Sequence, residues 1–211
     1  MNLTRCTRFL ITCVLLLPIG AQASPSLKGG TGLINLPTAT TSTGTSFYYQ
    51  DGAAITNGIW AMGGGFFEGG MLRREGENLY NLKMKFLPEA GWIPASAVGV
   101  RGMASTNDQR EYYMVLSKYW AYPSSIISLG VLRSGSATEG TQNVFGGIEI
   151  PFFGRGRVLG EYDGKTETYN AGLGYYLNQS IYLYYHFLDV SSRGSPEGQD
   201  KVFGVTYSRS F

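Results

Sequence analysis

The sequence has no cysteine after Cys13 and only one histidine, His186. From residue 24 onward this excludes disulfides and thiolate metal sites, and it excludes zinc sites built on several imidazoles. No run of about 18 apolar residues follows residue 24, which excludes a membrane-spanning helix in that part of the chain. Any membrane span after residue 24 must therefore be built from strands.

The first residues have the pattern of a secretory signal peptide. Arg5 and Arg8 precede an apolar run over residues 9–19, and Ala21 and Ala23 place small residues at a cleavage site. The run is short for a membrane anchor helix, which is the alternative. We expect residues 1–23 to be removed and residues 24–211 to form a single domain.

Charge of either sign is not in excess. The leader contains two of the 17 basic residues, so the basic residues that remain equal the 15 acidic ones in number. A neutral chain has no bulk electrostatic attraction to nucleic acid, and no nucleic-acid partner is expected.

What the sequence does contain is glycine, tyrosine and alternating hydrophobicity. Thirty glycines and fifteen tyrosines favour strands and turns over helices. Alternation with a period of two predicts twelve strands. They are 29–36, 45–50, 58–68, 78–87, 95–104, 110–120, 125–133, 142–151, 156–163, 168–177, 180–189 and 201–211. The predicted fold is all-β, an antiparallel transmembrane β-barrel of the outer-membrane type with about 12 strands, or 10 if residues 29–50 form a plug or a periplasmic arm.

The connections between these strands alternate in length. RREGEN, STNDQR, SGSATEG and VSSRGSPEGQD are polar and often long, whereas AYPS, FFGRG and NQ are tight. Long external loops and short periplasmic turns are typical of outer-membrane barrels. We expect the last strand to run inward and to end on Phe211, which would present an aromatic end to the barrel-assembly machinery.

Large aromatic residues gather at the predicted periplasmic strand ends. An interfacial girdle facing outer-membrane lipids would place aromatic residues there, although core packing explains any one of them alone. The predicted girdle comprises Trp92, Trp120, Tyr122, Phe152 and Phe153.

Charged residues inside the strands fall on the polar faces. A lysine facing lipid near the bilayer midplane would cost about 2–4 kcal/mol, so these side chains should face the lumen. The predicted lumen or glycan-contact residues are Lys83, Lys85, Arg101, Glu149, Arg157 and Glu161. They form either a salt-bridge network that fills a narrow barrel or a set of ligand contacts.

Catalytic chemistry has little support. No serine lies in a motif of an activated nucleophile that could be paired with His186. Glu149 and Glu161 are weak evidence for a general acid and a general base, because basic residues share their face. GGGFFEGG lacks the spacing and the following helix of a phosphate-binding loop, and we expect it to bend strands and allow close packing in the barrel wall. We predict no catalytic residue, no metal and no cofactor.

Four segments carry a family resemblance. GGTGLINLPTA, KMKFLPEAGWIPASAVGVRGMAS, EYYMVLSKYW and FGGIEIPFFGRGRVLGEYDGKTETYNAGLGYYL occur in this order over residues 29–177. Together they resemble the YjbH-like family of outer-membrane proteins linked to exopolysaccharide biosynthesis. The matching positions include Pro37, Lys85, Pro94, Tyr112, Lys118, Glu149, Glu161, Tyr162 and Asp163. The resemblance implies a barrel in the outer membrane, a place in polysaccharide secretion, and periplasmic or lipoprotein partners. Family members are several times longer, so this chain corresponds to one barrel unit.

Three functions therefore stay open at the level of sequence. The first is a small barrel that serves exopolysaccharide assembly or secretion through a mixed-charge lumen. The second is a structural or adhesive barrel whose lumen is plugged by side chains. The third is an outer-membrane acyl hydrolase or acyltransferase, which would need a serine and a histidine.

Overall fold

The structure, a computed structural model, describes residues 24, 26–28, 30–52, 59–74, 76–104, 110–121, 124–135, 140–190 and 201–210. The expected signal peptide, Tyr122 and Phe211 lie outside the described residues. Within the described ranges, no helix is long and apolar enough to cross a membrane.

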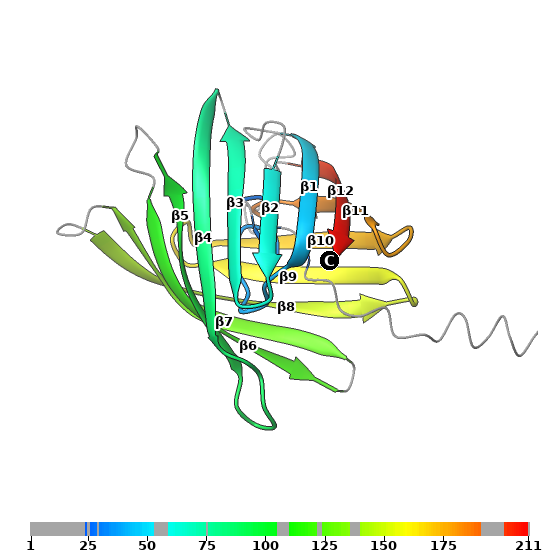
Figure 1. The fold of residues 1–211 in the computed structure, drawn as a ribbon, viewed down its shortest axis with the longest axis horizontal. Coiled ribbons are helices and arrows are strands. Elements are labelled where there is room, and N and C mark those ends of the chain that lie inside the picture. The colour runs from blue at the N-terminus through cyan, green and yellow to red at the C-terminus, as the bar shows by residue number, and fades with distance from the viewer. Residues whose placement is uncertain are drawn as a thin grey trace, which may run out of the picture.

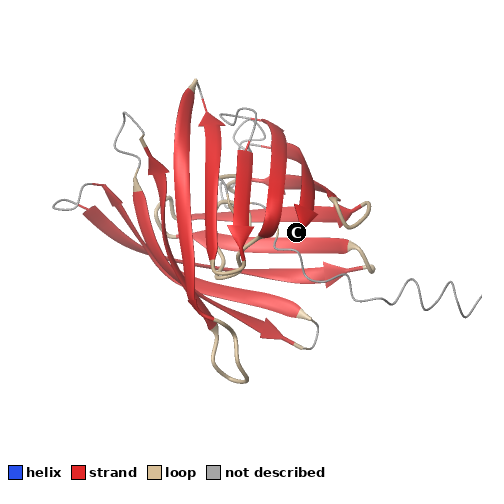
Figure 2. Ribbon diagram, viewed as in Figure 1, coloured by secondary structure: helices blue, strands red, loops and turns tan. Residues whose placement is uncertain are grey.

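Twelve antiparallel strands form one closed barrel, in which each strand pairs with its neighbours along the chain and β1 closes the ring against β12 (Figures 1 and 2). Closure leaves no free sheet edge, which a barrel in lipid requires. The strands are β1 (Thr43–Gly52), β2 (Ile59–Gly64), β3 (Phe67–Arg74), β4 (Glu77–Leu87), β5 (Ala95–Met103), β6 (Glu111–Trp120), β7 (Ser125–Gly135), β8 (Gly140–Phe152), β9 (Gly156–Asp163), β10 (Thr168–Tyr176), β11 (Ile181–Phe187) and β12 (Lys201–Ser210).

Alternation along each strand separates an apolar outer wall from a polar interior. On β4, Leu82 and Phe86 are about half exposed on the outside, whereas Asn81 and Lys83 between and beside them are buried. On β12, Phe203 points outward and Val202 inward. Successive side chains of a strand point to opposite faces, so the period-two pattern of the sequence becomes the inside and outside of the barrel.

We name the two ends of the barrel by the strand connections that lie there. One end, which we call the turn end, holds the connections β2–β3, β4–β5, β6–β7, β8–β9 and β10–β11, together with the start of β1 and the end of β12. The other end, the loop end, holds the remaining connections. In Figure 1 the β4–β5 connection extends at the bottom of the barrel, where Glu89 accepts a hydrogen bond from Lys118 and one from the backbone N–H of Tyr119 at 3.0 Å.

Two of the expected strands are wrong, and the two errors cancel in the count. Residues 30–36, the described part of the expected strand 29–36, form no strand, and the expected strand 58–68 is two strands, β2 and β3, joined at Gly65 and Phe66. Gly65 has a φ of +84°, a conformation that glycine adopts without steric cost, so GGGFFEGG makes a tight turn rather than a bend within one strand. The count of twelve is confirmed.

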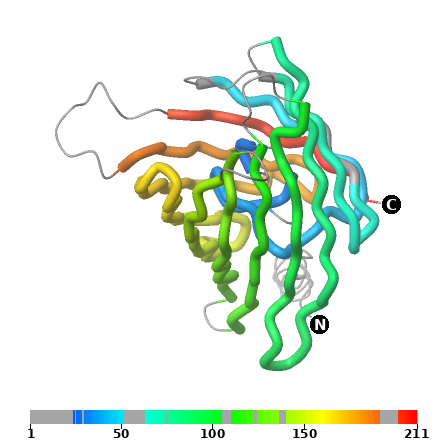
Figure 3. Tube along the Cα trace, turned by 90° about the vertical axis from the view of Figure 1, so that its left-hand side faces the viewer, coloured from blue at the N-terminus to red at the C-terminus, as the bar shows by residue number. Residues whose placement is uncertain are grey.

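The segment before β1 lies inside the barrel. We call its described part, residues 24, 26–28 and 30–42, the plug; Figure 3 shows it in dark blue within the ring of strands. Leu33, Ile34 and Leu36 are completely buried, and Leu27 is 2% exposed. Leu33, Ile34 and Leu36 are buried without the inside-and-outside alternation of a wall strand, as suits a segment that the wall surrounds. The alternative of ten strands with a plug over 29–50 is correct for the plug but wrong for Thr43–Gly52, which forms β1.

Candidate functional site

The candidate site is the interior of the barrel, where the plug meets charged side chains of the wall. Among the predicted lumen residues, Lys83, Arg101, Glu149 and Glu161 are buried. Lys85 and Arg157 are only partly buried. These residues come from β4, β5, β8 and β9, so charges from two sides of the barrel face the same plug.

Glu161 binds the centre of the plug. Its carboxylate accepts hydrogen bonds from the backbone N–H groups of Asn35 at 2.8 Å, Ile34 at 3.0 Å and Leu36 at 3.2 Å. The side-chain amide of Asn170 on β10 donates a fourth at 2.8 Å. Converging N–H groups stabilise an anion as a cation would, so this carboxylate is satisfied without a basic partner.

Lys83 and Glu68 both bind the plug at Thr31. Their ammonium and carboxylate groups lie 3.3 Å apart, and both side chains are 3% exposed. Glu68 accepts from the backbone N–H of Thr31 at 2.7 Å and from that of Ser42 at 2.8 Å, while Lys83 donates to the Thr31 carbonyl at 2.9 Å. Both charges are therefore paired and hydrogen-bonded, as buried charges need to be.

Sequence reasoning missed Glu68 because of the turn at Gly65. If residues 58–68 are counted as one strand, the turn interrupts the period of two, and the count does not show whether a residue after the turn faces inward or outward. Counted from the start of β3 instead, Glu68 falls on the inner face with Gly70 and Leu72, all of them buried. The GGG run at residues 63–65 is the sequence signal that could have revealed the turn, because glycine readily adopts the positive φ that Gly65 has.

A third cluster lies near the loop end, around Glu111 on β6. Arg101 Nε lies 2.5 Å from this carboxylate, Lys165 Nζ 2.7 Å and Lys28 Nζ 3.7 Å. Lys28, which belongs to the plug, is also 3.9 Å from Asp163. Of these residues only Arg101 was predicted as a lumen contact; Asp163 was a matching position of the resemblance, and the others lie at strand ends, in a turn or in the plug.

The remaining predicted charged residues, Glu149, Arg157 and Lys85, make fewer hydrogen bonds to the plug. Arg157 pairs with Glu149 at 3.2 Å, and Glu149 accepts a hydrogen bond from the Ser24 hydroxyl at 2.9 Å. Lys85 lies with its ammonium 5.7 Å from the centre of the Phe66 ring, at the turn end. No ion pair joins Lys85 to a described residue, which sets it apart from Lys83.

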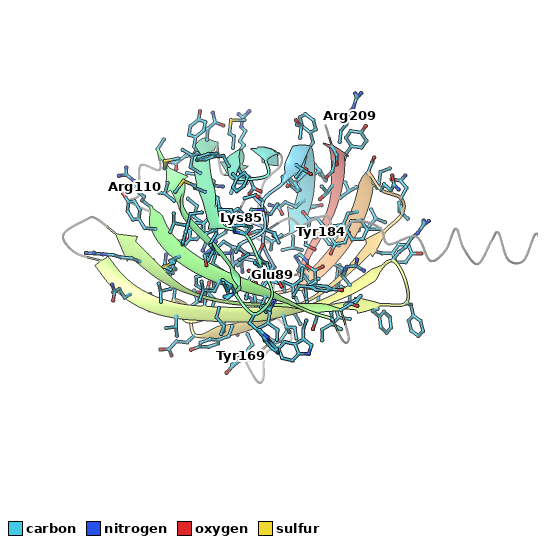
Figure 4. All side chains as sticks on the ribbon, turned by 60° about the horizontal axis from the view of Figure 1, so that its bottom comes forward. Lys85, Glu89, Arg110, Tyr169, Tyr184 and Arg209 are labelled. Atoms are coloured by element: carbon cyan, nitrogen blue, oxygen red, sulfur yellow. The ribbon has the colours of Figure 1, made fainter. Side chains whose placement is uncertain are left out.

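His186 is packed, and its geometry shows no catalytic dyad. Its ring stacks on Tyr184 with centroids 4.8 Å apart, and neither ring nitrogen has a hydrogen-bond partner in the described ranges. Tyr184, inside the barrel in Figure 4, donates to Gln50 at 3.1 Å, and Gln50 donates to the plug carbonyl of Leu27 at 3.2 Å. Glu149 and Glu161 are likewise engaged with the plug. The described residues also contain no group of three or more His, Cys, Asp or Glu side chains placed to hold a metal.

The predicted girdle residues that the structure describes lie at the turn end. Trp92 is 90% exposed on the β4–β5 connection, Trp120 ends β6, and Phe152 contacts Phe153 edge to face at the β8–β9 turn. A second set of outward aromatic residues near the loop end was missed. It comprises Tyr49, Tyr80, Tyr112, Tyr169 and Phe203, and Figure 4 shows Tyr169 on the outside of the barrel. Aromatic residues near both rims fit a wall that crosses two membrane interfaces.

Comparison with known proteins supports the fold. No family model matches the chain, and no curated protein sequence matches it. Among solved structures, a KdgM porin is similar with a TM-score of 0.55 and 14% sequence identity, over 78% of this chain and 98% of that one. At this identity the similarity concerns the fold alone. The chain is a closed antiparallel β-barrel of the outer-membrane type.

Proposed function

We propose that this barrel takes part in the assembly or secretion of an exopolysaccharide, and that its plug closes the lumen at rest. The observation that carries the proposal is the mixed-charge interior, in which wall charges hold the plug through its backbone. In this proposal the barrel catalyses no reaction of its own. Residues 1–23 direct export, and the assembly machinery inserts the barrel with the help of Phe211.

The segments that resemble the YjbH-like family meet at the plug. Glu161 of EYDGK binds the backbone of Ile34 to Leu36 in GGTGLINLPTA, and Lys83 of KMKFLP binds Thr31 in the same segment. Ser117 of EYYMVLSKYW accepts a hydrogen bond from the backbone N–H of Ala39 at 2.8 Å. Motifs far apart in sequence thus form one interface, which supports a common functional unit rather than chance similarity.

The plug makes the resting lumen impassable to a polymer. Burying each of Leu27, Leu33, Ile34 and Leu36 contributes about 1.5–3 kcal/mol, so spontaneous release of the whole plug is rare. Ser24 lies against Glu149 near the turn end, and the plug joins β1 at the same end. A periplasmic or lipoprotein partner of the secretion apparatus could therefore pull on the plug from the periplasm.

A permanently closed structural or adhesive barrel is the second candidate. It is favoured by the pairing of Lys83, Arg101 and Arg157 with carboxylates, because a network that only fills space leaves its charges compensated. The two candidates differ in one property, namely whether the plug must move.

A reversible cross-link tests that property. Ala39→Cys with Ser117→Cys would join the plug to β6, where the Ala39 N–H already contacts the Ser117 side chain. No native cysteine lies after Cys13, so the two introduced thiols have no competing partner in the barrel. Cells lacking the wild-type gene would carry the double variant, and secreted polysaccharide would be measured before and after adding dithiothreitol.

We expect oxidised cells to secrete little polymer and reduced cells to recover, while each single cysteine variant secretes normally. Normal secretion with a complete cross-link would leave only the structural barrel. Unchanged secretion in cells that lack the gene altogether would contradict any role in secretion.

A further inference from the structure

The loop end of the lumen contains a cavity of about 140 Å³ between the plug and the wall. We call it the mouth cavity. Lys28, Arg101, Glu111 and Lys165 provide its charged lining, and Leu72 and Leu79 of the β3–β4 hairpin provide an apolar side. The side chains of Lys28 and Lys165 are 29% and 36% exposed, so the cavity reaches solvent. One water needs about 10–15 Å³ of such a cavity, so the mouth cavity has room for a charged group with part of a sugar ring.

The lining has more positive than negative charge. Glu111 is shared by Arg101, Lys165 and Lys28, and Asp163 lies 3.9 Å from Lys28 alone. Three cations thus face two carboxylates. At a partly buried site such an excess is compensated best by an anion that enters the cavity.

Arg101 has a donor left for such an anion. Its Nε donates to Glu111 at 2.5 Å and its Nη1 to the carbonyl of Asn35 in the plug at 2.6 Å. Its Nη2 is buried and has no hydrogen-bond partner among the described residues, and the whole residue is 4% exposed. A buried guanidinium nitrogen without a partner is costly, and a carboxylate is the acceptor that matches its planar geometry.

We propose that the mouth cavity binds the carboxylate of an acidic sugar that arrives at the loop end. Arg101 Nη2 and Lys165 Nζ hold the carboxylate, and Leu72 and Leu79 pack against the carbon face of the ring. The choice of a sugar, rather than another organic acid, rests on the proposed role in polysaccharide secretion. The cation excess and the free guanidinium nitrogen do not depend on that role.

Binding can be measured with the purified full-length barrel in detergent. Saturation-transfer NMR and calorimetry would compare a glucuronate-containing tetrasaccharide, a neutral cellotetraose and inorganic sulfate. We expect the acidic tetrasaccharide to bind, the neutral one not to bind, and sulfate to bind more weakly. Added salt should weaken binding, because the attraction is between charges.

Two variants test the assigned residues. Lys165→Gln lies in an exposed turn and should weaken binding roughly tenfold, as loss of a charge-assisted hydrogen bond does. Arg101→Lys keeps the positive charge but loses the planar set of guanidinium donors. It should weaken binding, while the heat-dependent band shift shows that the barrel still folds. Lys201→Gln, an exposed lysine outside the cavity lining, is the matched control and should bind as the wild type does.

Equal binding of the acidic and neutral tetrasaccharides, or wild-type binding by both variants, would overturn the proposal. Equal binding of sulfate would reduce the cavity to a general anion site and overturn its assignment to a sugar. These measurements use purified protein, so they stand apart from the secretion assay. A barrel that binds acidic sugar but does not affect secretion would contradict the proposed function alone.

Discussion

At the residue scale, the plug is held mainly by side chains of the wall that bind its backbone. Glu161 and Glu68 accept plug N–H groups, and Lys83, Arg101 and Asn81 donate to plug carbonyl groups. A segment without regular secondary structure needs such partners, because buried backbone groups without hydrogen bonds are costly. Charges in this lumen therefore replace the strand partners that the plug lacks.

Replacing Glu161 by glutamine should loosen the plug. The amide of glutamine has one acceptor oxygen where the carboxylate has two, and its NH₂ would face donors of the plug. We expect Glu161→Gln to lower the free energy of unfolding by about 1–3 kcal/mol, measured from urea titration of the folded band. Single-channel recording should show openings that the wild type lacks. Glu167→Gln, in the exposed β9–β10 turn, should change neither measurement.

The two lysines of KMKFLP should differ sharply. Lys83→Gln leaves Glu68 buried without its cation and should cost about 3–5 kcal/mol of stability. Lys85→Gln removes a half-buried contact with Phe66 and should cost less than about 1 kcal/mol. Urea resistance of the two single variants, compared side by side, gives the answer. Similar losses for both would mean that Lys83 is not buried against Glu68.

Parity explains why the sequence located some of the interior charges and missed others. Lys83, Arg101 and Glu161 lie inside strands that the sequence predicted, where alternation assigns a face directly. Glu68 follows a turn that was not recognised, and Lys28 belongs to a segment with no alternation at all. The contacts between the wall and the plug therefore could not be predicted from the sequence, because alternation does not show where the irregular plug lies inside the barrel.

At the element scale, an aromatic ladder inside the barrel is formed by side chains of β10 and β11. Tyr176, Tyr182, Tyr184 and His186 lie in a row, with neighbouring centroids 4.4, 6.0 and 4.8 Å apart. The rings need space over neighbouring strands, and glycines provide it. A Cβ at Gly174 would collide with Tyr182, and one at Gly204 would collide with Tyr184.

Gly174→Ala and Gly204→Ala should therefore destabilise the barrel by about 1–3 kcal/mol each, the usual cost of overpacking. The measurement is the urea midpoint of the inserted barrel, together with the yield of the heat-modifiable form. Gly69→Ala on β3 is a matched control, because a Cβ there meets no atom within 4 Å. If all three variants behaved alike, the effect would come from strand propensity and not from the tyrosine ladder.

The plug shows where element prediction from pattern stops. Residues 29–36 and a real barrel strand both combine glycine with aliphatic residues, and a window of eight residues does not separate them. The structure resolves this through burial, since Leu33, Ile34 and Leu36 are fully enclosed while a strand of this wall exposes every other residue. Twelve strands came from the sequence with one segment wrongly included and one wrongly merged.

At the scale of the whole molecule, an even number of strands places the start of β1 and the end of β12 at the same end of the barrel. The plug enters and leaves at that end, whereas the mouth cavity and Lys165 lie at the other. In an outer-membrane orientation, the plug would be accessible to periplasmic partners and the mouth cavity to molecules outside the cell. The proposals on secretion and on sugar binding therefore concern opposite ends of one barrel.

Cysteine labelling determines which end faces the outside. Thr166→Cys lies in the β9–β10 turn at the loop end, and Ala121→Cys follows β6 at the turn end; both positions are exposed. Long loops face outward and short turns face the periplasm in barrels of this type, so a membrane-impermeant maleimide should label Thr166→Cys on intact cells and Ala121→Cys only after the outer membrane is broken. A tag within residues 195–200, which lie outside the described residues between β11 and β12, should be as accessible as Thr166→Cys. The opposite labelling would invert the topology, place the mouth cavity in the periplasm, and make its ligand a periplasmic molecule.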